Sequence, residues 1–223
     1  MTRFLRFLFF GVLVRGVILL GLGLTVRHRD RLPRKGPAII AANHNSHLDT
    51  LALMSLLPLR LLPKLRPVAA ADHFLSGRIR SWFARDIVGI IPLTRAQTRK
   101  GANPLADLEA ALDRGEILIL FPEGSRGEPE ALGRFKTGLG QLAATCPGVP
   151  VMPVYMHGFG KALPRGSSLL VPFNCTVSVG EALYGRDFVG SERAGAQARR
   201  AFMSAYEARI SDLAAAETAP DWD

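Results

Sequence analysis

The sequence predicts an α/β domain with a mixed, largely parallel sheet flanked by helices, preceded by an N-terminal membrane-embedded helical segment. Two observations support this prediction. Short β-like apolar runs alternate with helical stretches from residue 36 onward, and residues 4–26 are almost continuously apolar. Strands that alternate with helices are typical of α/β domains. With 223 residues, of which 48% are hydrophobic, the chain is long enough to bury one full core.

The expected elements follow from apolar runs and from capping residues. Strands are expected at residues 37–42, 67–71, 89–93, 116–121, 149–155 and 176–179. Helices are expected at residues 48–57, from Asn103-Pro104 to the stop at Gly115, and through the tail at 191–217. The predicted organisation is an anchor with a basic collar at 1–35, a domain at 36–190 and a C-terminal packing helix and tail at 191–223.

The apolar segment Phe4–Val26 has about the length of a helix that crosses a bilayer. Only Arg6 and Arg15 interrupt it, and their spacing predicts opposite helix faces. A central arginine costs roughly 2.5–3.5 kcal/mol on membrane insertion. We therefore expect an embedded anchor that spans the bilayer or re-enters it, with a buried core helix as the alternative. The basic run at residues 27–35 predicts that the rest of the chain faces the cytoplasm, at the inner membrane if the protein is bacterial.

The charge balance favours anionic partners, since the formal net charge is +9. We expect no nucleic-acid partner, because the sequence has neither Cys/His finger spacing nor a basic helix with heptads. The two cysteines, Cys146 and Cys175, suggest neither a disulfide framework nor a cysteine metal site.

The richest polar cluster is Asn43–Asp49, which leaves a predicted strand and enters a predicted helix. His44 in this turn is free to face a cleft, and Asp49 in the first helical turn can orient its imidazole. This is the arrangement of a general base and its orienting carboxylate. Two alternatives stay open. His44, His47 and Asp49 are also metal-ligand types, to which Asp72 or His73 would add, and a helix cap at Ser46 explains the same pattern. His47 is expected on the helix side, away from the cleft.

A second polar turn, Pro122–Gly127, follows the predicted strand Ile117–Phe121. The carboxyl ends of strands are where open α/β sheets place ligand sites. Here Glu123 can accept a substrate hydroxyl or brace a neighbouring residue, and Arg126 can bind a phosphate through two hydrogen bonds, while Lys136 adds a cation further along. A solvated loop is the alternative, because these residue types are common in turns.

Four blocks together resemble the glycerolipid acyltransferases, the family of the 1-acyl-glycerol-3-phosphate acyltransferases. His44 and Asp49 match the family's His-x4-Asp block, and Phe121–Arg126 resembles its F-P-E-G-T-R block with serine for threonine. Gly89–Arg95 fits the second block and Val149–Val154 the proline-bearing fourth. The blocks occur in family order across roughly residues 35–180.

The resemblance implies an acyltransferase-type fold and an O-acyltransferase reaction. His44, steered by Asp49, would deprotonate the hydroxyl of a lysophospholipid, most specifically lysophosphatidic acid, which would attack an acyl thioester. The implied substrate-binding residues are Arg95, Glu123, Gly124, Ser125, Arg126 and Lys136. No metal or other cofactor is implied, because acyl-CoA or acyl carrier protein is a co-substrate. The implied partners are the lipid bilayer, the lysophospholipid acceptor and the acyl donor.

Three other functions stay open at this stage. The acceptor could be a different lysolipid, such as a lyso-aminolipid of the lyso-ornithine type. The histidine cluster is also compatible with a metal-dependent phosphoesterase, and the basic, apolar N-terminus with a non-enzymatic membrane adaptor.

Overall fold

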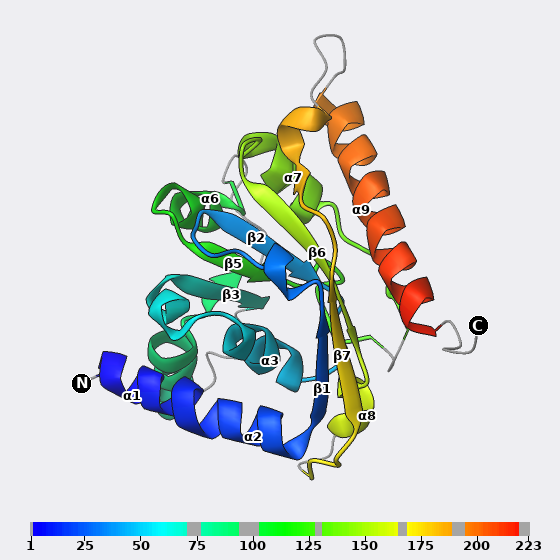
Figure 1. The fold of residues 1–223 in the computed structure, drawn as a ribbon. Coiled ribbons are helices and arrows are strands. Elements are labelled where there is room, and N and C mark those ends of the chain that lie inside the picture. Colours follow the sequence, from blue (N-terminus) through cyan, green and yellow to red (C-terminus); the bar gives the residue numbers. More distant parts are fainter. Residues whose placement is uncertain are drawn as a thin grey trace.

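An eight-stranded sheet forms the centre of the molecule (Figure 1). The computed structural model describes residues 2–70, 77–93, 103–127, 131–164, 169–188 and 195–218, without the side chain of Leu19. The strands are β1 (Gly23–Arg27), β2 (Ala38–Ala42), β3 (Leu65–Ala70), β4 (Ile91–Leu93), β5 (Ile117–Leu120), β6 (Pro150–His157), β7 (Asn174–Val179) and β8 (Leu183–Tyr184). Their order is β1-β7-β6-β2-β5-β3-β4, with β8 also paired to β6.

The sheet is mixed and mostly parallel, as the sequence predicts. Neighbouring strands run parallel from β6 through β2, β5 and β3 to β4, and β1 runs parallel to β7. Only the contacts of β6 with β7 and β8 are antiparallel. β2 is buried at all five positions, which is typical of a central strand covered by helices on both faces.

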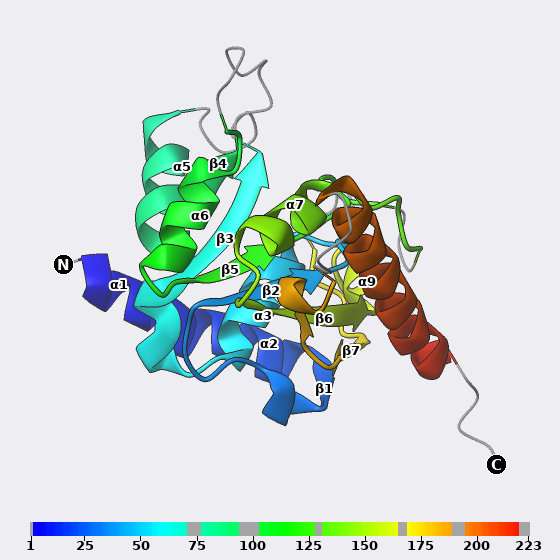
Figure 2. The same cartoon turned by 90° about the horizontal axis from the view of Figure 1, so that it is seen from above.

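Helices cover both faces of this sheet. The α-helices are α1 (Thr2–Leu8), α2 (Arg15–Gly21), α3 (Leu48–Leu56), α5 (Arg78–Trp82), α6 (Ala106–Asp113), α7 (Gly138–Thr145), α8 (Phe159–Ala162) and α9 (Gly195–Thr218). The other helical segments are η1 (Phe9–Val14), η2 (Arg29–Arg31), η3 (Leu59–Lys64), η4 (Phe83–Val88) and η5 (Gly185–Asp187). Figure 2 shows α7 and α9 on one side of β2 and β6, with α2 and α3 on the other.

Successive side chains of β2 pack into two separate hydrophobic cores, one on each face of the sheet, because side chains alternate across a strand. Ile40 packs with the N-terminal helices and α3, whereas Ile39 packs with α6, α7 and α9. All six predicted strands and the three predicted helices are present. The helix expected from Asn103-Pro104 begins at Ala106, with Leu105 as its N-cap, and Asn103 accepts the Leu105 N–H at 3.0 Å in the turn before it.

The N-terminal segment differs from the prediction of one apolar helix through Val26. The helix ends at Gly21, and β1 (Gly23–Arg27) follows as an edge strand paired with β7. The local sequence explains the break, because Leu22 is extended and stands between two glycines, which are poor helix residues. The sheet therefore begins inside the stretch that the sequence assigned to the anchor.

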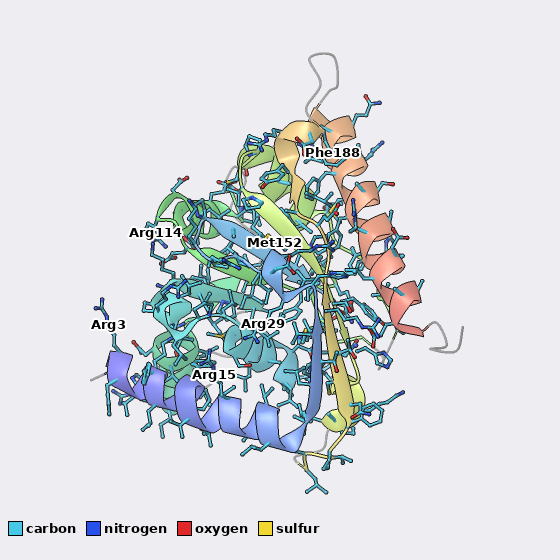
Figure 3. The ribbon with its side chains drawn as sticks, viewed as in Figure 1. Arg3, Arg15, Arg29, Arg114, Met152 and Phe188 are labelled. Carbon is cyan, nitrogen blue, oxygen red and sulfur yellow. The ribbon has the colours of Figure 1, made fainter. Side chains whose placement is uncertain are left out.

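The prediction that Arg6 and Arg15 lie on opposite faces is wrong. Arg6 donates to the carbonyls of Leu65 (3.1 Å) and Val88 (3.0 Å), while Arg15 donates to those of Ser55 (3.1 Å) and Leu57 (2.8 Å). Both arginines therefore point into the domain, and Figure 3 shows Arg15 on the side of the helix that faces α3. The cause is the π-helical stretch η1, whose i→i+5 hydrogen bonds add a residue to the turn and rotate the later side chains.

One face of the N-terminal helix is buried and the other is exposed. Phe10, Val14, Ile18 and Leu22 pack into the core. The exposed apolar side chains are Phe4, Leu5, Phe7, Leu8, Val12, Leu13, Val17 and Leu20. Among the described residues, no helix combines the length and apolarity needed to cross a bilayer. The exposed side chains also show that the segment is not the fully buried core helix of the alternative prediction.

Candidate active site

His44 and Asp49 form a hydrogen-bonded pair in the turn between β2 and α3. The Nδ1 atom of His44 lies 2.9 Å from Oδ2 of Asp49. The same oxygen accepts the backbone N–H groups of Asn45 (2.7 Å) and Ser46 (2.8 Å). The Asp49 side chain is fully buried, whereas that of His44 is 19% exposed. Three donors therefore fix the carboxylate, and the carboxylate fixes the imidazole.

A residue next to the neighbouring strand β5 packs on the face of the His44 ring. Phe121, directly after β5, stacks on the imidazole with ring centroids 4.0 Å apart and planes 20° from parallel. With Nδ1 donating to a carboxylate, the Nε2 atom carries the free lone pair. Because the His44 side chain also lines a cavity, a molecule in that cavity can reach it.

The Pro122–Gly127 turn is tied to the His44 turn through backbone atoms. The Gly127 N–H donates to the His44 carbonyl at 3.0 Å, and the Lys136 N–H donates to the Pro122 carbonyl at 2.8 Å. Gly124 has a φ of +72°, and a Cβ at this position would collide with the Lys136 ammonium. The backbone conformation thus favours glycine, and any larger residue would also have to displace the end of the Lys136 side chain. These hydrogen bonds join the His44 turn and the Pro122–Gly127 turn into one polar surface.

Glu123 belongs to the second of these turns, but its side chain is buried away from the cavity. Its Oε1 accepts the His44 N–H at 3.3 Å. Burial raises the pKa of the Glu123 carboxyl, an effect that the N–H groups of His44 and Gly133 oppose. Of the two roles that the sequence offered for Glu123, its contact with the His44 backbone matches the bracing of a neighbour.

The cavity has a volume of about 660 Å³ and two chemically different ends. The polar end is formed by His44, His47, Ser125, Arg126 and Lys136. The apolar remainder is lined by side chains of β3, η4, α6 and α7, including Val68, Phe83, Leu108 and Leu142. Such a space accommodates a molecule with an anionic head and a hydrocarbon tail.

Two of the predicted phosphate-binding cations are available in this cavity. Within the described ranges, the side chains of Arg126 and Lys136 make no ion pair, and both line the polar end. The prediction that His47 faces away from the cleft is wrong, because His47 is exposed and lines the same cavity. As the residue before α3, it sits at the rim of the strand-end opening rather than on the buried helix side. Arg95 lies outside the described residues.

The alternative interpretations fare differently. Ser46 is not the N-cap of α3, because that position is His47, which makes no side-chain capping hydrogen bond. The Oγ of Ser46 instead accepts the Leu48 N–H at 3.3 Å in the turn that leads into the helix. In the part of the chain that the structure describes, no group of three or more His, Cys, Asp and Glu side chains is arranged to hold a metal ion. Asp72 and His73, which the metal hypothesis invoked, lie outside that part.

Sequence reasoning missed the roles of Asn43 and Tyr206. Asn43 bridges β2 to β6, donating to the Met156 carbonyl at 2.9 Å and accepting the Met156 N–H at 2.7 Å. It thereby continues the strand ladder into the active-site turn. Tyr206, which the sequence showed only as one apolar position of a packing helix, has a buried hydroxyl on the side of Glu123.

The site thus combines a histidine–aspartate pair at a strand end with cations that make no ion pair among the described residues and with a largely apolar cavity. The family model described as Acyltransferase matches residues 23–157, from β1 to the end of β6. The chain belongs to the Acyltransferase family.

Individual relatives carry the same designation. A chloroplastic 1-acyl-sn-glycerol-3-phosphate acyltransferase of Arabidopsis thaliana is 32% identical over 164 residues, which are 73% of this chain and 44% of the relative. The 1-acyl-sn-glycerol-3-phosphate acyltransferase alpha of Homo sapiens is 28% identical over 72% of this chain and 55% of its own length. The match thus spans about half the length of these curated relatives.

A solved structure shares the fold. The crystal structure of the 1-acyl-sn-glycerophosphate (LPA) acyltransferase PlsC from Thermotoga maritima superposes with a TM-score of 0.71, covering 100% of this chain and 83% of that one, at 19% identity. This similarity confirms the acyltransferase fold that the sequence predicts.

Proposed function

We propose that this protein is an O-acyltransferase that moves a fatty acyl group from acyl-CoA or acyl carrier protein to the free hydroxyl of a lysophospholipid. Lysophosphatidic acid is the acceptor we propose first, with phosphatidic acid as the product. The observation that carries the proposal is the 2.9 Å contact between His44 Nδ1 and Asp49 Oδ2 at the polar end of an otherwise apolar cavity. The names of the relatives from Arabidopsis thaliana and Homo sapiens support the choice of acceptor.

In the proposed reaction His44 is the general base. Its Nε2 takes the proton of the acceptor hydroxyl while Asp49 stabilises the imidazolium that forms. The hydroxyl oxygen attacks the thioester carbonyl and forms a tetrahedral oxyanion. Its collapse breaks the carbon–sulfur bond, and the imidazolium returns the proton to the thiolate. An ester and a free thiol result, without a covalent enzyme intermediate.

The oxyanion needs hydrogen-bond donors. In the Pro122–Gly127 turn the N–H of Gly124 is bonded to Phe121, and that of Gly127 to His44. Among the described residues, the N–H groups of Ser125 and Arg126 make no hydrogen bond. Both residues line the cavity beside His44. We assign these two amides to the oxyanion.

The cations select the acceptor head. Arg126 and Lys136 present two positive charges at the polar end of the cavity, where a phosphate monoester supplies matching oxygens. The resemblance adds Arg95 as a third cation, and Glu123 and Gly124 as residues that shape the glycerol site. The contacts of Glu123 favour an indirect role, through the His44 backbone.

We further propose that the protein works on a membrane surface, with the catalytic domain on the cytoplasmic side, at the inner membrane if the protein is bacterial. Supporting this, the exposed apolar face of the N-terminal helix is joined by Ile79, Trp82 and Phe83, because Phe9 packs edge-on against Phe83 at 5.2 Å. An apolar face of this kind lies in the interfacial plane of a bilayer. In this proposal residues 1–35 are the anchor and collar, 36–190 the acyltransferase domain and 191–223 the packing helix and tail.

An acyl-transfer screen tests the proposal. Purified protein in vesicles is offered lysophosphatidic acid, a lyso-aminolipid and neutral monoacylglycerol, each with acyl-CoA and with acyl carrier protein, and products are identified by mass spectrometry. Phosphatidic acid is the expected product. Transfer only to the lyso-aminolipid would reassign the acceptor.

The same screen tests the cation assignment. Lys136→Met is expected to raise KM for lysophosphatidic acid about 10- to 100-fold while leaving KM for monoacylglycerol unchanged, since a charge-assisted contact is worth about 1.5–3 kcal/mol. An equal effect on both acceptors would contradict phosphate binding by Lys136. Vesicle binding without any transfer would favour the adaptor hypothesis, and chelator-sensitive phosphate release would favour the phosphoesterase.

A further inference from the structure

Tyr206 of α9 lies where the catalytic turn meets the C-terminal helix. Its side chain is fully buried, and its ring packs edge-on against Phe135 with centroids 5.3 Å apart. Phe135 directly precedes Lys136, whose N–H donates to the Pro122 carbonyl. The ring of Tyr206 is therefore packed against the segment that supports the Pro122–Gly127 turn.

The Tyr206 hydroxyl and one Glu123 oxygen both need a partner. Among the described residues the buried Tyr206 hydroxyl has no hydrogen-bond partner, and the buried Oε2 of Glu123 has none that meets the usual distance and angle limits. The Gly133 N–H acts on the Glu123 carboxylate from beside Oε2, which leaves room for a further donor. Oε2 lies against Gly133, and Oε1 accepts the His44 N–H. Buried polar groups in folded proteins are almost always hydrogen-bonded, to protein or to an ordered water.

The packing brings Tyr206 to the segment beside Glu123, because its ring contacts Phe135 and the next residue, Lys136, is hydrogen-bonded to Pro122. Burial raises the pKa of the Tyr206 hydroxyl, and the negative charge of Glu123 raises it further. A hydroxyl whose proton is held this firmly is a hydrogen-bond donor, and a carboxylate is an acceptor. The other groups that act on Glu123 among the described residues are the N–H groups of His44 and Gly133 and the charges of His44 and Asp49.

We propose that Tyr206 is a positioning residue for the acyl transfer. Its hydroxyl donates to the Glu123 carboxylate, directly or through one buried water, and so keeps Oε1 in place for the His44 N–H. In this proposal α9 helps to position His44, through Tyr206 and Glu123, in addition to packing against the sheet. The inference rests on the proposed function for its catalytic consequence, but the pair itself is a property of the fold.

The sign of the pH effect follows from this hydrogen bond. A donor to a carboxylate favours its charged form, so loss of the hydroxyl raises the pKa of Glu123 further. Protonation of Glu123 weakens the acceptor of the His44 N–H. The acid-side decline of kcat is therefore expected to move to higher pH in Tyr206→Phe, by about one pH unit. In a Glu123→Gln background, where this group has no charge to lose, the same substitution is expected to produce no shift.

A double-mutant cycle tests the pair without reference to activity. Tyr206→Phe keeps the ring and its contact with Phe135, and Glu123→Gln keeps the shape of the side chain. Urea unfolding of the parent, both single variants and the double variant gives the coupling. The folding equilibrium constant of the double variant is expected to be about tenfold larger than the value obtained by multiplying the effects of the two single substitutions. Tyr155→Phe, which removes the hydroxyl of another buried tyrosine, is the matched control and is expected to add independently to Glu123→Gln.

The outcomes separate the two proposals. Additive effects of Tyr206→Phe and Glu123→Gln would overturn the pair. Coupling in stability together with an unchanged acid limb of kcat in Tyr206→Phe would overturn the positioning role. Coupling in a protein that transfers no acyl group to any lysolipid would leave the pair standing and refute the proposed function.

Discussion

Replacing Asp49 by asparagine isolates the charge of the catalytic pair from its geometry. Oδ2 of Asp49 accepts three N–H groups, those of the His44 ring, Asn45 and Ser46. An asparagine carbonyl can accept the same three, so the turn and the histidine tautomer are retained. The lost quantity is the negative charge that stabilises the imidazolium.

The structure sets the size of both effects of Asp49→Asn. Charge-assisted hydrogen bonds are worth about 1.5–3 kcal/mol, and 1.4 kcal/mol corresponds to a factor of ten, so kcat is expected to fall about 10- to 100-fold. The amide NH2 then takes the place of Oδ1, which has no hydrogen-bond partner among the described residues. A buried donor without a partner costs about 1–3 kcal/mol. For a chain of this size, Tm is expected to drop by roughly 2–12 °C.

Initial rates of thiol release from acyl-CoA, with lysophosphatidic acid in vesicles, measure the first effect, and thermal unfolding measures the second. Asp86→Asn, at an exposed position of η4, is the matched control and is expected to leave both unchanged. A kcat of Asp49→Asn within threefold of the parent would refute the role of this carboxylate as the partner of the base.

Three further predictions follow from individual contacts. Gly124→Ala is expected to lower stability by about 1–2 kcal/mol and to raise KM for lysophosphatidic acid, because φ there is +72° and the new Cβ displaces the Lys136 ammonium. Unfolding curves and acceptor titrations measure the two effects. Arg15→Met is expected to lower the free energy of unfolding by about 1–3 kcal/mol in urea, since Arg15 satisfies the Ser55 and Leu57 carbonyls at the C-terminal end of α3. Glu123→Gln is expected to flatten the pH dependence of unfolding above the usual glutamate pKa. The raised pKa of Glu123 means that the folded state holds the proton more tightly, so parent stability falls as pH rises between the unfolded and folded values.

Each of these predictions has a result that would contradict it. A Gly124→Ala protein with parental KM and stability would mean that the turn tolerates a side chain over Lys136. If Arg15→Met had the same free energy of unfolding as the parent and as the control Arg3→Met, an exposed position, Arg15 would not stabilise the end of α3. Parallel pH–stability curves for the parent and Glu123→Gln would show that the Glu123 carboxyl titrates alike in the folded and unfolded states.

The features that the sequence predicted well depend on local spacing. The His44–Asp49 pair spans one turn between a strand and a helix, so its geometry follows from neighbouring residues. The strands were predictable for a similar reason, because β2 and β5 are short, continuously apolar runs bounded by polar turns.

The features that the sequence did not predict depend on tertiary contacts. The face of Arg15 changes because η1 is π-helical, which residue spacing alone does not indicate. Glu123 has the residue type of a substrate ligand, yet the depth of its side chain is set by the approach of the His44 turn and Gly133. The position of the Tyr206 hydroxyl near Glu123 depends on how α9 packs across more than 80 residues of intervening chain.

The most direct test of the central claim is the rate of phosphatidic acid formation from lysophosphatidic acid and an acyl thioester by the parent protein and by His44→Ala. General-base catalysis contributes about 10²- to 10⁴-fold. The account predicts product formation by the parent and a fall of that size in His44→Ala, with folding retained. Equal rates in the two proteins, or no transfer by the parent from either donor to any lysolipid, would contradict it.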